Sequence, residues 1–271
     1  MRIVTFRRDG IVQHGVRAGD AIAVYPDATS AVDLAQNAAR LATTGHVALA
    51  DVELLPPVPH PGKIICIGLN YRAHAIEGGN AIPDYPAVFL RVPSSLTAPG
   101  GIIIYPEISD KLDYEAELAV VIGRTARSVS KADALDYVAG YSCFNDGSVR
   151  DYQRKSTQWT MGKNFDGTGG FGPDLVTPDG LPAGAAGLRL VARLNNETMQ
   201  DSTTGDMIFD VATLIATLSE AMTLEPGDVI ATGTPSGVGY ARKPPVFMRP
   251  GDVCEIEIER IGILTNTIAA R

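Results

Sequence analysis

The chain has 271 residues, of which 45% are hydrophobic and 20% charged, so it is long enough for one large folded domain or one large and one small. The formal net charge of −8 and the absence of a Lys/Arg cluster exclude non-specific nucleic-acid binding, which needs a basic surface. No apolar run approaches the ~20 residues that span a bilayer, and Arg7, Arg8 and Asp9 stand where a signal peptide has its apolar region. We therefore expect a cytoplasmic protein with no nucleic-acid or membrane partner.

Residues 1–60 are predicted to form a small N-terminal α/β unit. The sequence predicts a strand over residues 1–6, a turn at Asp9-Gly10, a strand over 21–25 and a helix over 29–42. The proline-rich segment LPPVPHPGK, residues 55–63, cannot continue a helix or a central strand. It marks a boundary, after which residues 61–271 are expected to form the larger domain.

The larger domain is predicted to be rich in strands. Short Val/Ile/Leu segments between glycines and prolines predict strands in KIICIGL, AVFLRV, GIIIY, GYSCFND, LRLVARLN, DVIATG and, as the last strand, CEIEIER. Helices are predicted over residues 131–137 and 209–221, and NYRAHAIEGG is predicted to be a short polar helix or turn. The expected fold class is therefore β-rich α+β.

The segment KLDYEAELAVVIG, residues 111–123, begins with three carboxylates at alternating positions. In a strand, Asp113, Glu115 and Glu117 share one face. Ala119 and Val121 continue that face, so both faces become apolar and the strand enters the interior. The strand CEIEIER also alternates acids with apolar residues, but its acid face stays polar, which is typical of a solvated face.

Carboxylates at the mouth of a buried strand need partners, because an isolated buried charge is costly. Mg2+ prefers oxygen ligands, and Asp146, which ends the strand GYSCFND, is the natural third ligand beside Glu115 and Glu117. On spacing alone, ordinary salt bridges to Arg150 or Lys163 are the alternative explanation.

The segment NYRAHAIEGG places His74 three residues before Glu77. If the segment is a helical turn, the two side chains are neighbours. A histidine oriented by a carboxylate can act as a general base toward water. The alternative is an ordinary His/Glu pair on the protein surface, because polar residues of these types are mostly exposed.

Two glycine-rich segments are candidates for ligand-binding loops. The first, WTMGKNFDGTGGFGP, could hold the ammonium of Lys163 close to an anion. Its residues 167–172 match GxGxxG, but no strand precedes them and Pro173 follows, so we reject a dinucleotide site and a nucleotide-dependent oxidoreductase. The second, TGTPSGVG at residues 232–239, lacks the lysine of a phosphate loop, but its N–H groups could bind a carboxylate.

The three cysteines, Cys66, Cys143 and Cys254, are widely spaced in apolar segments. This pattern predicts reduced core residues and no disulfide framework. Without a CxxC motif or a Cys/His cluster, no structural zinc site is expected.

From about Lys63 onward the sequence resembles the fumarylacetoacetate hydrolase superfamily. The resemblance is carried, in order, by IGLNYRAHAIE, FLRVPSS, DYEAELAVVIG, GYSCFNDGSVRDYQ, QWTMGKNFDGTGGFGP, TGTPSGVG and RPGDVCEIEIERIGILTN. It implies a mixed β-sandwich roll and a homodimer, and the N-terminal unit is similar to one that many members carry. Arg91 in FLRVPSS stands where many relatives have Lys, which could alter the acid group that is bound.

The resemblance also implies a set of site residues. They are Glu115, Glu117 and Asp146 as ligands of Mg2+ or Mn2+, His74 and Glu77 as a water-activating dyad on a lid segment, Lys163 at the substrate's oxygens, and Arg150, Gln153, Gly233 and Thr234 as substrate contacts.

The activity expected from this resemblance is hydrolysis of a carbon-carbon bond. The substrate would be a small anionic 2,4-diketo acid, an acylpyruvate such as fumarylpyruvate, cleaved to pyruvate and a carboxylic acid in aromatic or related carbon catabolism. The alternatives are an isomerase or decarboxylase of an unsaturated 2-oxo diacid, of the 2-hydroxyhepta-2,4-diene-1,7-dioate isomerase type, or an oxaloacetate decarboxylase. A binding protein without catalysis is a further alternative. The His74/Glu77 pair favours hydrolysis, since decarboxylation needs no attacking water.

Overall fold

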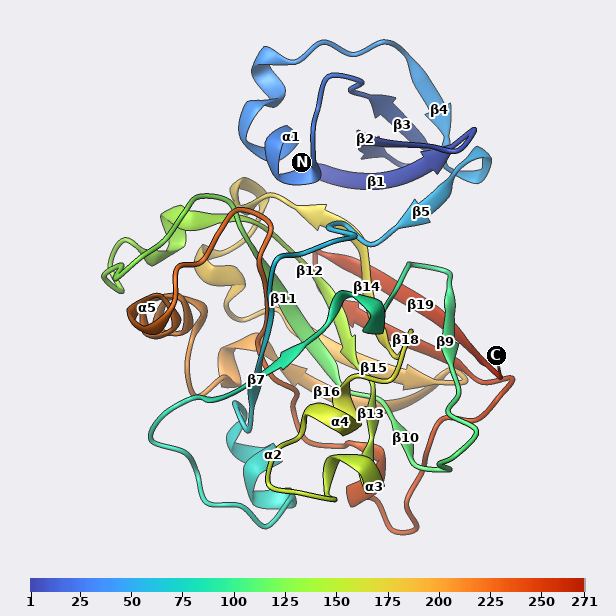
Figure 1. Ribbon diagram of the computed structural model, residues 1–271, viewed down its shortest axis with the longest axis vertical. Helices are drawn as coiled ribbons and strands as arrows, with labels where there is room; N and C mark the ends of the chain where they lie inside the picture. Colours follow the sequence, from blue (N-terminus) through green and yellow to red (C-terminus); the bar gives the residue numbers. More distant parts are fainter. Residues whose placement is uncertain (271) are drawn as a thin grey trace.

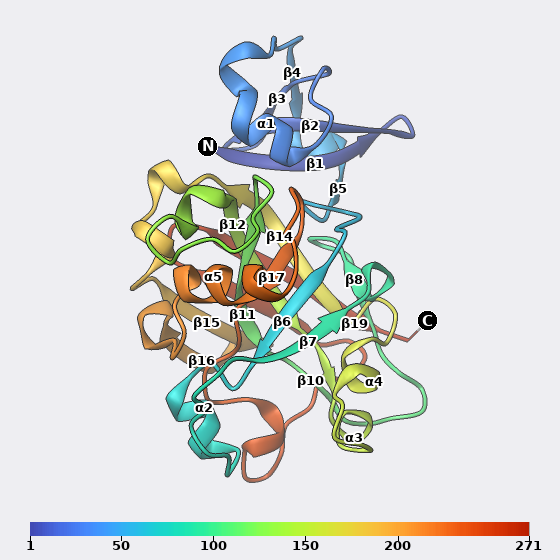
Figure 2. The same ribbon diagram turned by 60° about the vertical axis from the view of Figure 1, so that its left-hand side comes forward.

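The computed structural model describes residues 1–270 and has many strands and few helices (Figures 1 and 2). Over those residues the strands form sheets of 12, five and two strands, with both parallel and antiparallel pairs. The predicted fold class, a β-rich α+β roll of mixed sheets, is confirmed. In both views the N-terminal lobe lies at the top, and α2 (Arg72–Glu77), α3 (Arg150–Gln153) and α4 (Thr160–Lys163) lie toward the opposite end.

The N-terminal lobe is a small antiparallel arrangement of strands with one helix. Its elements are β1 (Arg2–Arg8), β2 (Ile11–Ala18), β3 (Ala21–Val24), helix α1 (Ala31–Asn37), the 3-10 turn η1 (Ala38–Arg40), β4 (His46–Ala48), the turn η2 (Leu49–Asp51) and β5 (Glu53–Leu55). Asp9 and Gly10 have φ angles of 50° and 79°, so they form the tight turn between β1 and β2. Strand β2 is absent from the predicted elements, because Gly15 interrupts its apolar residues.

The lobe and the larger domain share one sheet. Strand β1 pairs with β14 (Gly169–Val176), with Ile3 opposite Leu175. From there the sheet runs through β12 (Val138–Asp146), β11 (Ala116–Ile122), β17 (Val229–Ala231) and β6 (Ile64–Gly68) to β7 (Ala87–Arg91). The predicted boundary at residue 60 therefore falls between β5 and β6, within a continuous sheet.

Strand β11 lies in the middle of this sheet and is buried at every residue. Leu118 and Val120 pack into the large core, whereas Ala119 and Val121 pack into a second core that includes the apolar residues of α1. Both faces of the strand are therefore covered, as predicted from the apolar residues that follow its acids.

The five-stranded sheet covers the other side of the large core together with helix α5 (Val211–Ala221). Its order is β16 (Glu197–Thr203), β15 (Arg189–Leu194), β18 (Val253–Ile258), β19 (Gly262–Ala269) and β9 (Ile102–Ile104). The alternating burial of β18 agrees with its predicted solvated acid face. The prediction that this strand is the last is wrong, because β19 follows it and buries Asn266 with hydrogen bonds to Ala98 and Gly101.

The acid segment is not one continuous strand. Strand β10 (Leu112–Asp113) pairs with β13 (Ser148–Val149), and Tyr114 and Glu115 lie between β10 and β11. The Tyr114 N–H donates to the Asp113 side chain at 2.9 Å, so this donor is taken by a side chain and not by a neighbouring strand. The prediction of a single strand from Asp113 onward is therefore wrong at this point.

Two further corrections concern local structure. The predicted helix over 131–137 is only the 3-10 turn η4 (Ala134–Tyr137), because Ser130 and Asp133 hydrogen-bond to each other in a local turn. Strands β14 and β16 are absent from the predicted elements. The remaining short elements are η3 (Pro93–Ser95), β8 (Leu96–Thr97), η5 (Pro178–Gly180), η6 (Ala183–Ala185), η7 (Thr204–Asp206) and η8 (Gly239–Ala241).

The described residues include the GxGxxG segment, the three cysteines and the helices. The GxGxxG segment leads into β14 and then η5, so the helix that a dinucleotide fingerprint needs does not follow it. Cys66, Cys143 and Cys254 are buried and free, and burial raises the pKa of each thiol. Within residues 1–270 no helix is long and apolar enough to cross a membrane.

Candidate active site

A cavity of about 370 Å³ opens between α2, α3, α4 and the nearby ends of the central strands. Eight of the ten predicted site residues line it: His74, Glu115, Glu117, Asp146, Arg150, Gln153, Lys163 and Thr234. Glu77 and Gly233 are not among the lining residues.

Glu115, Glu117 and Asp146 form a buried carboxylate triad whose ligand atoms all lie within 4.8 Å of one another. The antiparallel register of β11 and β12 produces this meeting, because Glu117 lies opposite Phe144, two residues before Asp146. The Asp146 N–H also donates to the Glu115 carbonyl at 3.0 Å. Three oxygen donors so close together suit a hard divalent cation.

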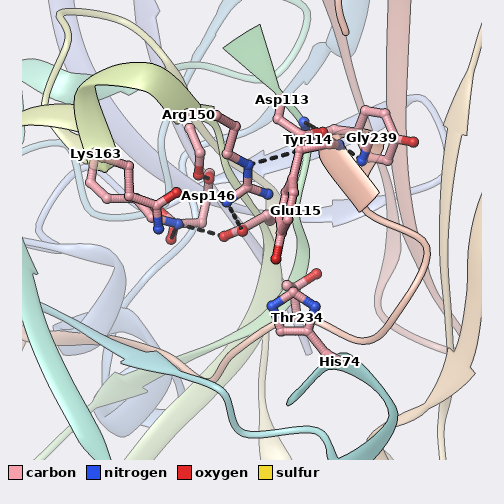
Figure 3. A network of polar contacts seen from close by, with 12 residues as sticks. His74, Asp113, Tyr114, Glu115, Asp146, Arg150, Lys163, Thr234 and Gly239 are labelled. Atoms are coloured by element: carbon pink, nitrogen blue, oxygen red, sulfur yellow. Dashed lines mark hydrogen bonds and ion pairs between the residues drawn. The ribbon is translucent and has the colours of Figure 1, made fainter. Parts of the chain in front are cut away.

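Two cationic side chains of the cavity lining contact the triad (Figure 3). The Glu115 carboxylate accepts from Arg150 Nη1 at 2.7 Å and from Lys163 Nζ at 2.5 Å, and Lys163 Nζ also contacts Asp146 Oδ2 at 2.6 Å. Burial alone would raise the pKa of Glu115, but the charges of Arg150 and Lys163 outweigh it and lower that pKa below its usual range. The salt bridges considered as an alternative to a metal are therefore present.

Glu117 differs from its two neighbours because it makes no ion pair with any of residues 1–270. One of its oxygens accepts the Gly233 N–H at 2.8 Å. Burial and the nearby charges of Asp146 and Glu115 raise the pKa of Glu117 well above its usual value. A buried acid surrounded by like charges gains most from an added cation, so the donor set fits a divalent metal in addition to the salt bridges.

Arg91 lies beneath the triad and not in the cavity lining. Its buried guanidinium donates to Asp146 Oδ1 at 2.6 Å, to the Gly147 carbonyl at 3.1 Å and to Thr168 Oγ1 at 2.9 Å. Arg91 therefore fixes the orientation of Asp146. It is not placed to contact an acid group of a substrate, so the expectation that it could alter the bound acid group is corrected.

Asp113, which has no predicted site role, fixes Arg150 from behind. Asp113 Oδ2 accepts from Arg150 Nε at 2.8 Å and from the Tyr240 N–H at 3.0 Å, and Asp113 Oδ1 accepts from the Gly239 N–H at 2.8 Å. Arg150 Nη1 also donates to Gln153 at 2.9 Å, whereas Arg150 Nη2 is buried without a partner among the described residues. This leaves an unused donor on a buried guanidinium that lines the cavity.

Helix α2 carries the predicted catalytic pair. His74 Nδ1 lies 3.2 Å from Glu77 Oε1, so the expected neighbour relation is present. Glu77 also accepts the Gly237 N–H at 2.9 Å, which anchors the helix to the 232–240 loop. His74 is 7% exposed and lines the cavity. With Nδ1 turned to Glu77, Nε2 is the nitrogen left to exchange protons within the cavity.

The 232–240 loop does bind carboxylates through its N–H groups, but these carboxylates belong to the chain itself. Gly233 serves Glu117, Gly237 serves Glu77, and residues 239 and 240 serve Asp113. Thr234 lines the cavity and its Oγ1 accepts from Gln200 at 2.8 Å. The loop therefore positions three acids of the site, and only Thr234 of the two predicted contacts faces the cavity.

The cavity wall also contains residues without a predicted site role, among them Phe89, Arg154, Trp159 and Tyr240. The rings of Phe89 and Trp159 pack edge to face with centroids 5.5 Å apart. Trp159 belongs to the quoted segment QWTMGK and Arg154 directly follows RDYQ, so proximity to the motifs was the only signal in the sequence.

Comparisons with known proteins show which family the chain resembles. The family described as "Fumarylacetoacetate (FAA) hydrolase C-terminal" matches residues 63–269, and "Rv2993c-like, N-terminal" matches residues 1–57. The chain is 47% identical over 224 residues to oxaloacetate tautomerase YisK of Bacillus subtilis (strain 168), covering 81% of this chain and 74% of that protein.

Two solved structures illustrate the range of activities named among the similar proteins. A 2-hydroxyhepta-2,4-diene-1,7-dioate isomerase from Mycobacterium marinum has a TM-score of 0.84 and 34% identity, covering 100% of this chain and 99% of that one. A fumarylacetoacetate hydrolase from Exiguobacterium antarcticum has a TM-score of 0.86 and 36% identity, covering 100% of both chains.

Proposed function

Because the chain belongs to the fumarylacetoacetate hydrolase family, we propose that its cavity catalyses metal-dependent proton transfer beside the carbonyl of a 2-oxo acid, with oxaloacetate as the first candidate. Keto–enol tautomerisation of oxaloacetate moves one proton between C3 and the 2-oxo oxygen. Names of similar proteins support tautomerase or isomerase chemistry better than acylpyruvate hydrolysis, the activity expected first from the sequence.

The observation that carries the proposal is the meeting of three features in one cavity. These are the buried carboxylate triad, the unpartnered Nη2 of Arg150, and His74 oriented by Glu77. The first suits a divalent cation, the second suits a substrate carboxylate, and the third suits proton transfer.

Glu115, Glu117 and Asp146 would hold Mg2+ or Mn2+, which when bound supplies Lewis-acid polarisation of the 2-oxo group. Arg150 Nη2 donates to the substrate carboxylate, because a buried guanidinium donor without a partner is costly to leave unused. Burial alone would lower the pKa of Lys163, but Asp146 and Glu115 raise it above its usual value. Lys163 therefore stays cationic and stabilises negative charge on the 2-oxo oxygen as the C3 proton leaves.

His74 moves the proton. Glu77 holds Nδ1, so Nε2 takes the proton from C3 and the electron pair of the C–H bond becomes part of the enolate. His74 then gives a proton to the 2-oxo oxygen, which produces the enol. The net reaction is a proton shift, so no water, oxidant or second substrate is needed.

Hydrolysis of an acylpyruvate is the second candidate. The same dyad could take a proton from water, and the Exiguobacterium neighbour is named as a hydrolase. Decarboxylation of oxaloacetate would form the same type of enolate without that water. Products separate the three reactions: tautomerisation leaves oxaloacetate, decarboxylation gives pyruvate, and hydrolysis of acetylpyruvate gives pyruvate and acetate.

The test incubates the Mg2+ or Mn2+ form with enol oxaloacetate and with acetylpyruvate, following ultraviolet absorbance and pyruvate release. The proposal expects faster decay of the oxaloacetate enol without extra pyruvate. His74→Ala should lower kcat by about 10² to 10⁴, whereas the control His46→Ala on exposed β4 should not. Stoichiometric pyruvate would contradict tautomerisation, and no turnover of either compound would favour a binding protein.

We also propose that the protein is a homodimer, as its family resemblance implies. The edge strand β7 leaves Val88 and Leu90 42% and 50% exposed, which gives an apolar surface that a second copy could cover. Sedimentation equilibrium on the metal-loaded protein tests the mass, and a monomer at all concentrations would contradict this proposal.

A further inference from the structure

Arg154 and Tyr240 form a cationic wall of the cavity that the proposed proton transfer does not use. Both residues line the cavity. The guanidinium carbon of Arg154 lies 4.4 Å from the centroid of the Tyr240 ring, and that of Arg150 lies 4.5 Å from the same centroid. Both guanidinium groups therefore contact the same aromatic ring.

The two arginines differ in their acid partners. Arg150 pairs with Asp113 and Glu115. The Arg154 side chain has no ion pair or hydrogen bond with any of residues 1–270, and its only described contact is with the Tyr240 ring. The positive charge of Arg154 is therefore not neutralised by an acid of the described chain, and it would attract an anion that reaches this wall.

Tyr240 has neighbours at its backbone and at its hydroxyl. Its N–H donates to Asp113 at 3.0 Å. Its hydroxyl lies against the C-terminal end of α2, where a Cβ added to Gly78 would be 3.0 Å from Tyr240 Oη. The contact with the ring restricts the Arg154 side chain before a ligand binds, so Arg154 gives up less freedom on binding.

We propose that Arg154 binds the second carboxylate of a 2-oxo diacid and thereby sets a preference for diacids over monoacids. The inference deepens the proposed function and rests on it for the identity of the substrate. The unpartnered Nη2 of Arg150 takes the carboxylate beside the 2-oxo group, and Arg154, on the same ring, takes the distal one. A planar guanidinium matches a carboxylate with two parallel hydrogen bonds. Because both guanidinium carbons lie within 4.5 Å of one ring centroid, the shared ring limits their separation, which suits a short diacid.

The test compares ligands that differ only in the distal carboxylate. Malate and lactate are titrated calorimetrically into Mg2+-loaded wild type, Arg154→Gln and the matched control Lys155→Gln, whose exposed neighbouring cation does not line the cavity. We expect the wild type and the control to bind malate at least about ten-fold more tightly than lactate, and Arg154→Gln to lose most of that preference. Equal melting temperatures of the three proteins would show that folding is unchanged.

The kinetic arm uses oxaloacetate tautomerisation. Arg154→Gln should raise KM for oxaloacetate by about ten-fold with a smaller change in kcat, because the distal carboxylate does not react. An unchanged malate preference in Arg154→Gln overturns the role of Arg154, even if tautomerisation is observed. Conversely, a wild type that turns over nothing contradicts the proposed function, while the malate and lactate titrations still decide the role of Arg154.

Discussion

At the scale of single residues, the chemistry of the cavity depends on which carboxylates already have a cation. Glu115 and Asp146 contact Lys163, and Asp146 also contacts Arg91. Glu117 makes no ion pair with any of the described residues, and its pKa is raised by burial and by the other two acids. It is therefore the residue whose charge a bound divalent cation would stabilise most.

The first prediction concerns this residue. Glu117→Gln should weaken Mn2+ binding by at least about ten-fold, because it replaces one of three anionic carboxylates with a neutral amide. Calorimetric titration of EDTA-stripped protein measures the effect. The control is Glu107→Gln, an exposed acid outside the cavity lining. Equal Mn2+ affinity in wild type and Glu117→Gln would contradict the assignment of the triad.

The second prediction concerns His14 and pH. Burial lowers the pKa of His14 below 6.5, with a smaller opposing effect of Asp33, and Thr5 Oγ1 lies 3.0 Å from Nδ1. The unfolded chain therefore binds this proton more readily, so His14 destabilises the fold as the pH falls below 6.5. Between pH 7 and about pH 5, the melting temperature of His14→Gln should fall less than that of wild type. The control is the exposed His46→Gln, and an identical pH profile for His14→Gln and wild type would refute this role.

The sequence predicted the identity of the triad better than its surroundings. The alternation of acids predicted that Glu115 and Glu117 share one face, and the family motifs added Asp146. The three do meet, although Glu115 lies just outside β11. The role of Asp113 was not predictable from alternation, because it depends on tertiary contacts with Arg150 and with residues 239 and 240. Periodicity describes which face a side chain shares and not which distant group it meets.

At the scale of elements, the site depends on loops and short helices pressed against strand ends. Gly68, at the end of β6, illustrates this, because a Cβ there would be 2.2 Å from Trp159 Cζ3. Trp159 is the only tryptophan of the chain. Its fluorescence therefore reports on the cavity wall.

The third prediction follows from this contact. Gly68→Ala should displace the indole ring, shift the tryptophan emission and lower kcat/KM by about ten-fold or more. Steady-state fluorescence and tautomerisation kinetics measure both effects. Gly180→Ala is the control, since a Cβ at Gly180 meets nothing within 4 Å. Unchanged emission and kinetics in Gly68→Ala would show that the ring is not held by this close approach.

Two errors in the predicted elements have different physical reasons. Strand β14 contains GGFGP, and glycine and proline are typical of turns, yet every residue of the strand is buried between β1 and β12. Conversely, residues 131–137 have helical composition but end as the turn η4, because Ser130 and Asp133 satisfy each other locally. Tertiary packing decided the first case and side-chain hydrogen bonding the second.

At the scale of the whole molecule, one sheet connects the N-terminal lobe to the strands of the active site. The sheet runs from β4 through β1 and β14 to β11 and β7. Composition and turn signals predicted a β-rich molecule with two parts, and the β-rich class is confirmed. The pairing of β1 with β14 was not predictable, because residues about 170 positions apart meet there and no local pattern encodes that register.

The metal dependence of enol oxaloacetate decay is the most direct test of the proposed tautomerase activity. EDTA-stripped wild type and Glu117→Gln are mixed with enol oxaloacetate, before and after Mg2+ or Mn2+ is added, while absorbance and pyruvate are followed together. We predict that metal accelerates enol decay in wild type without producing extra pyruvate. The acceleration by metal should be much smaller in Glu117→Gln. Enol decay at the uncatalysed rate in wild type that has bound metal would contradict the proposed activity.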